Sequence, residues 1–155
     1  MTAQTRSRAS VLVIGIGNPY GGDDAAALSV AERLMEHHPS HVRIVEHSGE
    51  GASLMDMWRG AEALIVIDAV HSGAAPGTVY RFEADHTRLP TGRFHRSTHA
   101  FGVAEAIEIA RALGRLPPRV TVYGIEGQTF EAGIGLTAPV ELAVEQVTQS
   151  VMQEW

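Results

Sequence analysis

Short apolar runs alternate along the chain with longer segments in which apolar residues recur every three or four positions. The short runs are rich in valine and isoleucine, which is typical of strands, and they cover residues 10–16, 42–47, 63–70, 77–83 and 119–126. The longer segments have the spacing of amphipathic helices, and they cover residues 27–35, 52–60, 101–114 and 138–152. Strands and helices are therefore expected to alternate along most of the chain.

This alternation predicts an α/β fold, because strands that are separated by helices form parallel sheets. We expect a single-domain three-layer sandwich, in which a mostly parallel twisted sheet of about five strands carries helices on both faces. The connection between the 63–70 and 77–83 strands is short, so these two are expected to form the one antiparallel hairpin. Residues 1–9 are polar and are expected to be a flexible tail before the domain of residues 10–155.

Composition narrows the classes of function. The chain has 155 residues, a net charge of −6 and only 12 lysines and arginines, which argues against a nucleic-acid partner. The chain contains no cysteine, which excludes disulfides, thiolate metal sites and a cysteine nucleophile. Any metal site of its own must therefore use histidine, aspartate and glutamate.

The apolar runs are also too short for a membrane protein. None approaches the roughly 20 residues that span a bilayer, and the polar start "MTAQTRSRAS" does not resemble a secretory signal. The pattern contains no heptad repeat that would favour an obligate oligomer. We therefore expect a cytoplasmic monomer without a membrane partner.

A glycine-rich turn follows the first predicted strand and ends in two aspartates, in the sequence "GIGNPYGGDD" at residues 15–24. Such turns often bind phosphate, but the glycine spacing differs from the dinucleotide motif and the P-loop lysine is absent. Asp23 and Asp24 would also repel a phosphate at the positive end of the following helix. The pair suits a divalent cation better. A nucleotide-binding protein, with Glu46 in the ribose position, is the weaker alternative.

Polar side chains gather where the predicted parallel strands end, and the carboxyl ends of such strands meet at one edge of the sheet. They are Asn18, Asp23, Asp24, Glu46, His47, Asp68, His71 and Glu126. His99 stands close to this edge, at the entrance to the 101–114 helix. Asp24, Asp68 and His99 are therefore the candidate site.

Asp23, Asp68 and His99 each also have an ordinary structural explanation. Asp24 is less easily explained, because a side chain already inside the first turn cannot cap a helix as well. Asp23, at the helix start, is expected to be an N-cap. Asp68 alone is explained equally well by hydrogen bonds to loop amides, and His99 alone by solvation. The convergence of Asp24, Asp68 and His99 is what favours a metal site.

Four motifs occur in order between residues 15 and 137: "GIGNPYGGDD", "IDAV", "STHAFG" and "GIGLT". Together they resemble the NiFe-hydrogenase maturation endopeptidases, which remove a C-terminal peptide from the hydrogenase large subunit after nickel insertion. The resemblance covers nearly the whole chain and implies that Asp24, Asp68 and His99 are catalytic and bind nickel. Glu46 stands where relatives often carry an aspartate, which makes it an accessory acid. Ala27 replaces a frequent glycine, a change that concerns helix packing more than metal binding.

The resemblance also implies a mechanism in which the substrate brings the nickel, held by its own thiolates. Alternatively, the resting protein holds another divalent cation at this site before the substrate binds. The metal would either polarise the scissile carbonyl or activate water, with an acidic residue accepting a proton, and the sequence does not choose between these roles. Because no nucleophile is visible, a nickel-sensing binding module or metallochaperone is the alternative function. The "GIGLT" motif is expected to be a turn that ends at Thr137, the N-cap of the last helix.

Overall fold

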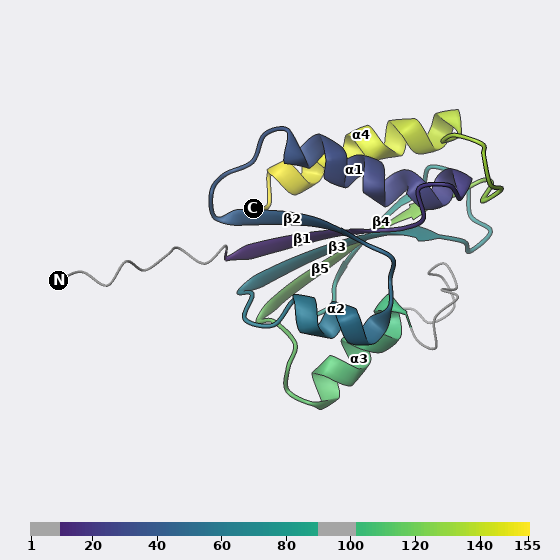
Figure 1. The fold of residues 1–155 in the computed structure, drawn as a ribbon. Coiled ribbons are helices and arrows are strands. Elements are labelled where there is room, and N and C mark those ends of the chain that lie inside the picture. Colours follow the sequence, from purple (N-terminus) through teal and green to yellow (C-terminus); the bar gives the residue numbers. More distant parts are fainter. Residues whose placement is uncertain (1–9, 90–101) are drawn as a thin grey trace.

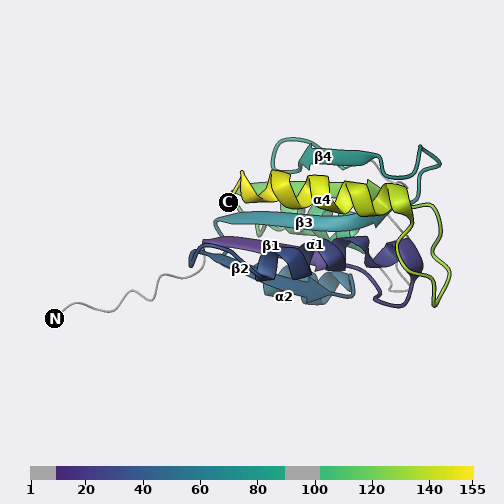
Figure 2. The ribbon, with the colours of Figure 1, turned by 90° about the horizontal axis from the view of Figure 1, so that it is seen from above.

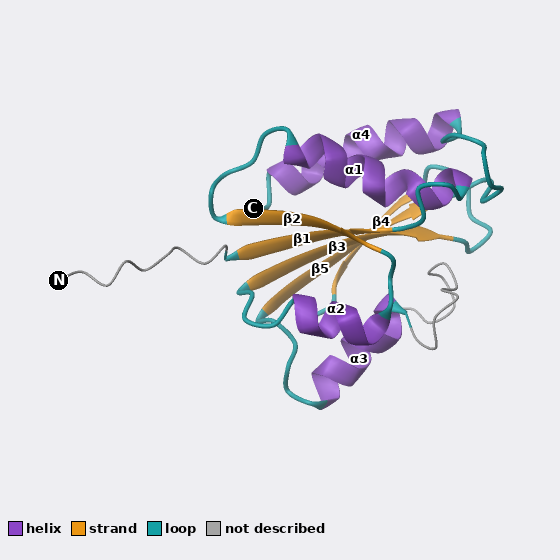
Figure 3. Ribbon diagram, in the orientation of Figure 1, coloured by secondary structure: helices purple, strands orange, loops and turns teal. Residues whose placement is uncertain are grey.

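The protein folds as a five-stranded sheet with helices on both faces, and the computed structural model describes residues 10–89 and 102–155 (Figures 1 and 3). The elements are β1 (Val11–Ile16), a 3₁₀ turn η1 (Gly22–Ala25), α1 (Ala26–Met35), β2 (Val42–His47), α2 (Gly51–Met57), β3 (Ala63–Val70), β4 (Val79–Glu83), α3 (Val103–Ala112), β5 (Arg119–Glu126) and α4 (Ala138–Met152). The strand order is β2-β1-β3-β5-β4. The predicted three-layer α/β sandwich is confirmed.

The helices form two layers, with α1 and α4 packed together on one face of the sheet and α2 and α3 on the other (Figure 1). Seen from above, α4 runs along the sheet beside α1 (Figure 2). Each layer covers its own apolar cluster, and every residue of β3 is buried. A strand with neighbours on both sides and helices on both faces has no position for a solvated side chain, which explains its continuous apolar sequence.

The helices agree with the sequence pattern to within a few residues. The helix α4 spans residues 138–152, as the spacing predicts, and α3 is shorter than predicted at both ends. None of the helices in residues 10–89 and 102–155 is both long and apolar enough to span a membrane.

The predicted hairpin between the 63–70 and 77–83 segments is wrong. The strand β4 pairs antiparallel with β5, and Val79 lies opposite Ile125. Both edges of β3 are already occupied, because β1 and β5 each pair with it in parallel. The largely buried β5 takes the interior position, whereas the half-exposed β4 suits the edge of the sheet.

The turn between β1 and α1 depends on two glycines. A Cβ at Gly17 would lie 2.0 Å from the carbonyl oxygen of Asp24, so only glycine permits the chain to fold back this closely. Gly22 has φ of +59°, and its Cβ would lie 2.7 Å from the carbonyl oxygen of Thr129. These approaches place the two aspartates of the turn against the carboxyl ends of the strands.

We expect Gly17→Ala to lower the free energy of unfolding by about 1–3 kcal/mol, because the new methyl group forces the turn away from Asp24. Urea unfolding followed by circular dichroism measures the change. Gly135→Ala is the matched control, since nothing lies within 4 Å of its added Cβ. Equal stability of the two variants would contradict this account of the turn.

Candidate functional site

The carboxylate of Asp23 is fully buried and joins the β1–α1 turn to the segment that follows β5. Its Oδ2 accepts hydrogen bonds from the backbone N–H of Gln128 (2.7 Å) and of Thr129 (3.1 Å). The backbone N–H of Thr137 donates to Oδ1 (2.8 Å), and its hydroxyl donates to Oδ2 (2.9 Å). The predicted N-cap role of Asp23 is wrong, because its side chain points across to residues 128–137 and caps no helix.

Thr137 is the N-cap residue of α4, as the sequence predicts. Its side chain makes no capping hydrogen bond, because the hydroxyl is directed to Asp23. The backbone of Asp23 adds a further contact, since its N–H donates to the carbonyl oxygen of Thr129 (2.8 Å). The segment of residues 127–137 is thus held against the turn that carries Asp24.

Asp24 and Asp68 lie close together at the carboxyl edge of the sheet. Asp68 is only 5% exposed, and its pKa is raised well above the ordinary value of 3.8. Burial is the main cause, the negative charge of Asp24 is the second, and a hydrogen bond from the N–H of Ala69 (2.8 Å) opposes both. Asp24 is half-buried, and its Oδ2 accepts the N–H of Asn18 (3.1 Å). A cation beside the two carboxyl groups would relieve their repulsion.

Of the two other predicted site residues, Glu46 and His99, the structure describes only Glu46. His99 lies in residues 90–101, outside the described residues. Glu46 is exposed on β2, where it is in register with Gly15. Within residues 10–89 and 102–155, no three acidic or histidine side chains gather as a metal-binding group. The roles of Asp24, Asp68, His99 and Glu46 in catalysis and metal binding stay predictions.

Glu126 is a buried acid at the same edge to which the sequence pattern assigned no role. It is 1% exposed at the end of β5, and its carboxylate accepts the N–H of Ser72 (2.9 Å), the Ser72 hydroxyl and the Tyr80 hydroxyl (3.2 Å). These bonds fix the turn after β3, next to His71, whose ring lies 5.1 Å from that of Phe130. Its place at a strand end was the only signal in the sequence.

The turn has little capacity left to bind a phosphate. The backbone N–H groups of most of its residues donate within the protein, namely those of Gly17, Asn18, Tyr20, Gly21, Asp23 and Asp24. The acceptor for Asn18 is the carboxylate of Asp24, which takes the place that an anion would occupy. This arrangement disfavours the nucleotide-binding alternative.

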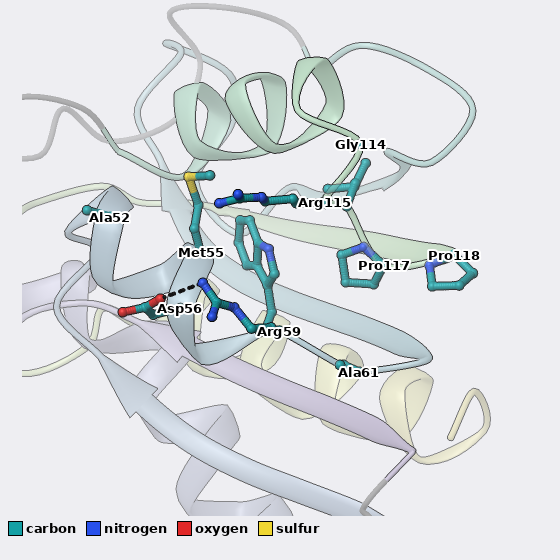
Figure 4. A pocket seen from close by; sticks show the side chains of 12 residues that line it. Ala52, Met55, Asp56, Arg59, Ala61, Gly114, Arg115, Pro117 and Pro118 are labelled. Carbon is teal, nitrogen blue, oxygen red and sulfur yellow. Dashed lines mark hydrogen bonds and ion pairs between the residues drawn. The ribbon is translucent and has the colours of Figure 1, made fainter.

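A pocket of about 630 Å³ lies at the opposite edge of the sheet, between the end of α2 and the connection from α3 to β5 (Figure 4). Arg59 pairs there with Asp56 at 3.3 Å, while Arg115, Pro117 and Pro118 belong to the other wall. The lining residues come before β3 and β5, whereas Asp68 lies near the end of β3 and Asp24 lies in the turn that follows β1. The pocket is therefore separate from the candidate site.

The protein is a single-domain α/β protein with two neighbouring acids, Asp24 and Asp68, at the carboxyl edge of a mostly parallel sheet. Comparison with known families then identifies the group within that class. The HycI family model, described as hydrogenase maturation protease, matches residues 28–154. The chain belongs to this family.

Individual relatives agree with the family. The hydrogenase 2 maturation protease of Escherichia coli is 30% identical over 146 residues, which cover 92% of this chain and 88% of that protein. The hydrogenase expression/formation protein HupD of Rhodobacter capsulatus is 36% identical over 123 residues. That match covers 78% of this chain but only 59% of HupD, so the chain corresponds to little more than half of that relative.

Solved structures show the same fold. The hydrogenase maturating endopeptidase HybD of Escherichia coli superposes with a TM-score of 0.78 at 27% identity, over 93% of this chain and 90% of that chain. The maturation protease HycI of Thermococcus kodakarensis has a TM-score of 0.73 at 20% identity, over 97% and 93%. At 20% identity, the likeness to HycI of Thermococcus kodakarensis concerns the fold alone.

We expect Asp23→Asn to destabilise the protein by about 2–3 kcal/mol, because an amide nitrogen in place of one oxygen would face backbone N–H donors. This reverses the tolerance that an N-cap role would give. Denaturant unfolding measures the loss, and Glu131→Gln is the control, since it removes the same charge from an exposed position nearby. A loss no greater than that of the control would contradict the role of Asp23 in holding residues 128–137 against the turn.

We expect Asp68→Asn to stabilise the metal-free protein increasingly as the pH rises above about 4. The unfolded chain loses the Asp68 proton near pH 3.8, whereas the folded protein holds it to higher pH. Over this interval the unfolded state binds fewer protons, so the stability of the wild-type protein falls relative to the variant, which cannot ionise. Urea unfolding in the presence of a chelator measures the difference, and a difference that stays constant with pH would contradict the raised pKa.

Proposed function

We propose that this protein is an endopeptidase that removes the C-terminal extension of a NiFe-hydrogenase large-subunit precursor after nickel insertion. One observation carries the proposal: in a member of the maturation protease family, Asp24 and Asp68 form a coupled acid pair at the carboxyl edge of the sheet. The cytoplasmic location, the monomeric state and the absence of a nucleic-acid partner stay predictions from the sequence.

The electrostatics of the pair support recognition of a metal that arrives with the substrate. Two neighbouring carboxyl groups, one of them buried, are disfavoured as anions until a cation lies beside them. Carboxylate oxygens, with a nitrogen from His99, would complete the coordination of a nickel ion that the precursor already holds through thiolates. Because this chain has no cysteine, it would not compete for the metal with thiolates of its own. A different divalent cation in the resting protein fits the same donors.

The raised pKa of Asp68 also suits hydrolysis. While no cation lies beside it, a carboxyl group with a pKa above its ordinary value can take up a proton closer to neutral pH than an ordinary aspartate, and attack of water on a peptide carbonyl requires a proton acceptor. Asp23 and Glu126 are less suited to this role, because hydrogen bonds from the surrounding chain already occupy their carboxylates. Asp24 and Asp68 are therefore the acids that we assign to the reaction.

The proposal is tested by incubating the purified protein with nickel-loaded precursor and measuring the precursor mass. We expect the mass to fall by that of one C-terminal peptide, and we expect nickel-free precursor to stay intact. Cleavage without nickel would contradict recognition of the metal. Binding of the loaded precursor without any change in mass would contradict the peptidase and favour the alternative of a nickel-sensing module or metallochaperone.

We expect Asp24→Asn and His99→Ala to abolish processing of the nickel-loaded precursor, because each removes a predicted nickel ligand. Asp24→Asn should retain the fold, since Asp24 is only half-buried. Circular dichroism checks the fold beside the cleavage assay. Glu131→Gln removes a carboxylate outside the pair and should cut at the wild-type rate. Asp23→Asn is not a suitable control, since it also disturbs the hydrogen bonds between Asp23 and residues 128–137. Full activity of a folded Asp24→Asn variant would remove Asp24 from the site.

A further inference from the structure

Two large apolar side chains are exposed on the segments that border the candidate site. Tyr20 is 76% exposed in the β1–α1 turn, and Ile134 is 48% exposed in the segment between β5 and α4. The other exposed large apolar residues among those described lie on helices or at their ends, namely Met35, Ile109, Leu113, Leu142 and Met152. The rim of the site therefore differs from the rest of the described surface.

The backbone of Tyr20 is fixed although its ring is exposed. Its N–H donates to Oδ1 of Asn18 (3.0 Å), and its carbonyl oxygen accepts the N–H of Gly133 (3.2 Å). The N–H of Asn18 in turn donates to Oδ2 of Asp24 (3.1 Å). A short series of hydrogen bonds thus connects the candidate ligand Asp24 to Tyr20 and then to the residue before Ile134.

The segment that carries Ile134 is fixed from the other side. Asp23 binds it at Gln128, Thr129 and Thr137, so both of its ends are held by one buried carboxylate. A backbone that is already ordered loses little conformational freedom on binding, so only the ordering of the exposed side chains remains as a cost. An aromatic ring adds a large apolar area with few rotatable bonds. Such residues are suited to recognition.

We propose that Tyr20 and Ile134 form a recognition ridge for an apolar side chain of the precursor, close to the scissile bond. This rests on the proposed function, which requires a polypeptide to pass over Asp24 and Asp68. A peptide bond held at that pair lies beside the turn of Tyr20, so the next residues of the substrate reach the ridge. The ridge orients the C-terminal extension, while Asp24 and Asp68 bind the nickel that the precursor holds.

The test compares steady-state processing of nickel-loaded precursor by the wild-type protein and by Tyr20→Ala, Ile134→Ala and the double variant. We expect the double variant to raise KM about tenfold with kcat within about twofold, because it loses binding that the substrate and the transition state share. Tyr20→Phe should behave as the wild type, since the apolar ring is what the ridge uses. Leu142→Ala is the matched control, because Leu142 is 65% exposed on α4.

A binding measurement separates the ridge from the proposed function. Affinity for nickel-loaded precursor is measured by titration calorimetry with each variant, and circular dichroism verifies that each is folded. If the wild type binds but does not cut, and the ridge variants bind more weakly, the peptidase is contradicted and the ridge stands. An unchanged KM and affinity in the double variant, an equal effect of Leu142→Ala, or no binding by the wild type would overturn the ridge. So would a loss of self-association, rather than of precursor binding, in the variants.

Discussion

The buried carboxylate of Asp23 is the interaction on which the geometry of the candidate site depends. Four hydrogen bonds, all from residues more than 100 positions away, satisfy a charge that would otherwise be costly to bury. Charge-assisted bonds of this kind are stronger than those between neutral groups. They fix the β1–α1 turn and the 127–137 segment to each other, and so two loops acquire a defined arrangement around Asp24.

The neighbouring pair of Asp24 and Asp68 has the opposite energetic character. The charge of Asp68 is poorly solvated and is opposed by that of Asp24, so the pair lowers stability when both groups are ionised. Carboxyl groups with perturbed pKa values are common at functional sites, where binding of a cation or transfer of a proton relieves the repulsion between them. Adjacent aspartates in one turn therefore serve different purposes: Asp23 stabilises the loops, and Asp24 belongs to the site that we propose.

Stabilising contacts of another kind lie away from this edge. Arg81 of β4 donates to Glu154 (2.8 Å), which also accepts the hydroxyl of Tyr123 from β5. Burial and this hydrogen bond raise the pKa of Tyr123 to about 12. The chain after α4 is thereby tied to the edge strand and its neighbour. The sheet thus has ion-paired contacts on its edge strand and coupled acids at its carboxyl ends, where parallel strands bring their loops together.

The sequence by itself determined the helices and strands, and it predicted that Asp24 and Asp68 share the carboxyl edge of the sheet. Apolar periodicity predicted α4 to the residue, because helical spacing is a local property. Chain order, with the rule that parallel strands end at one edge of the sheet, predicted that Asp24 and Asp68 lie together. Only the tertiary structure decided that β4 pairs with β5, that Asp23 binds residues 128–137 and that burial raises the pKa of Asp68. Each of these follows from contacts between distant segments, and local patterns carry no record of which segments meet.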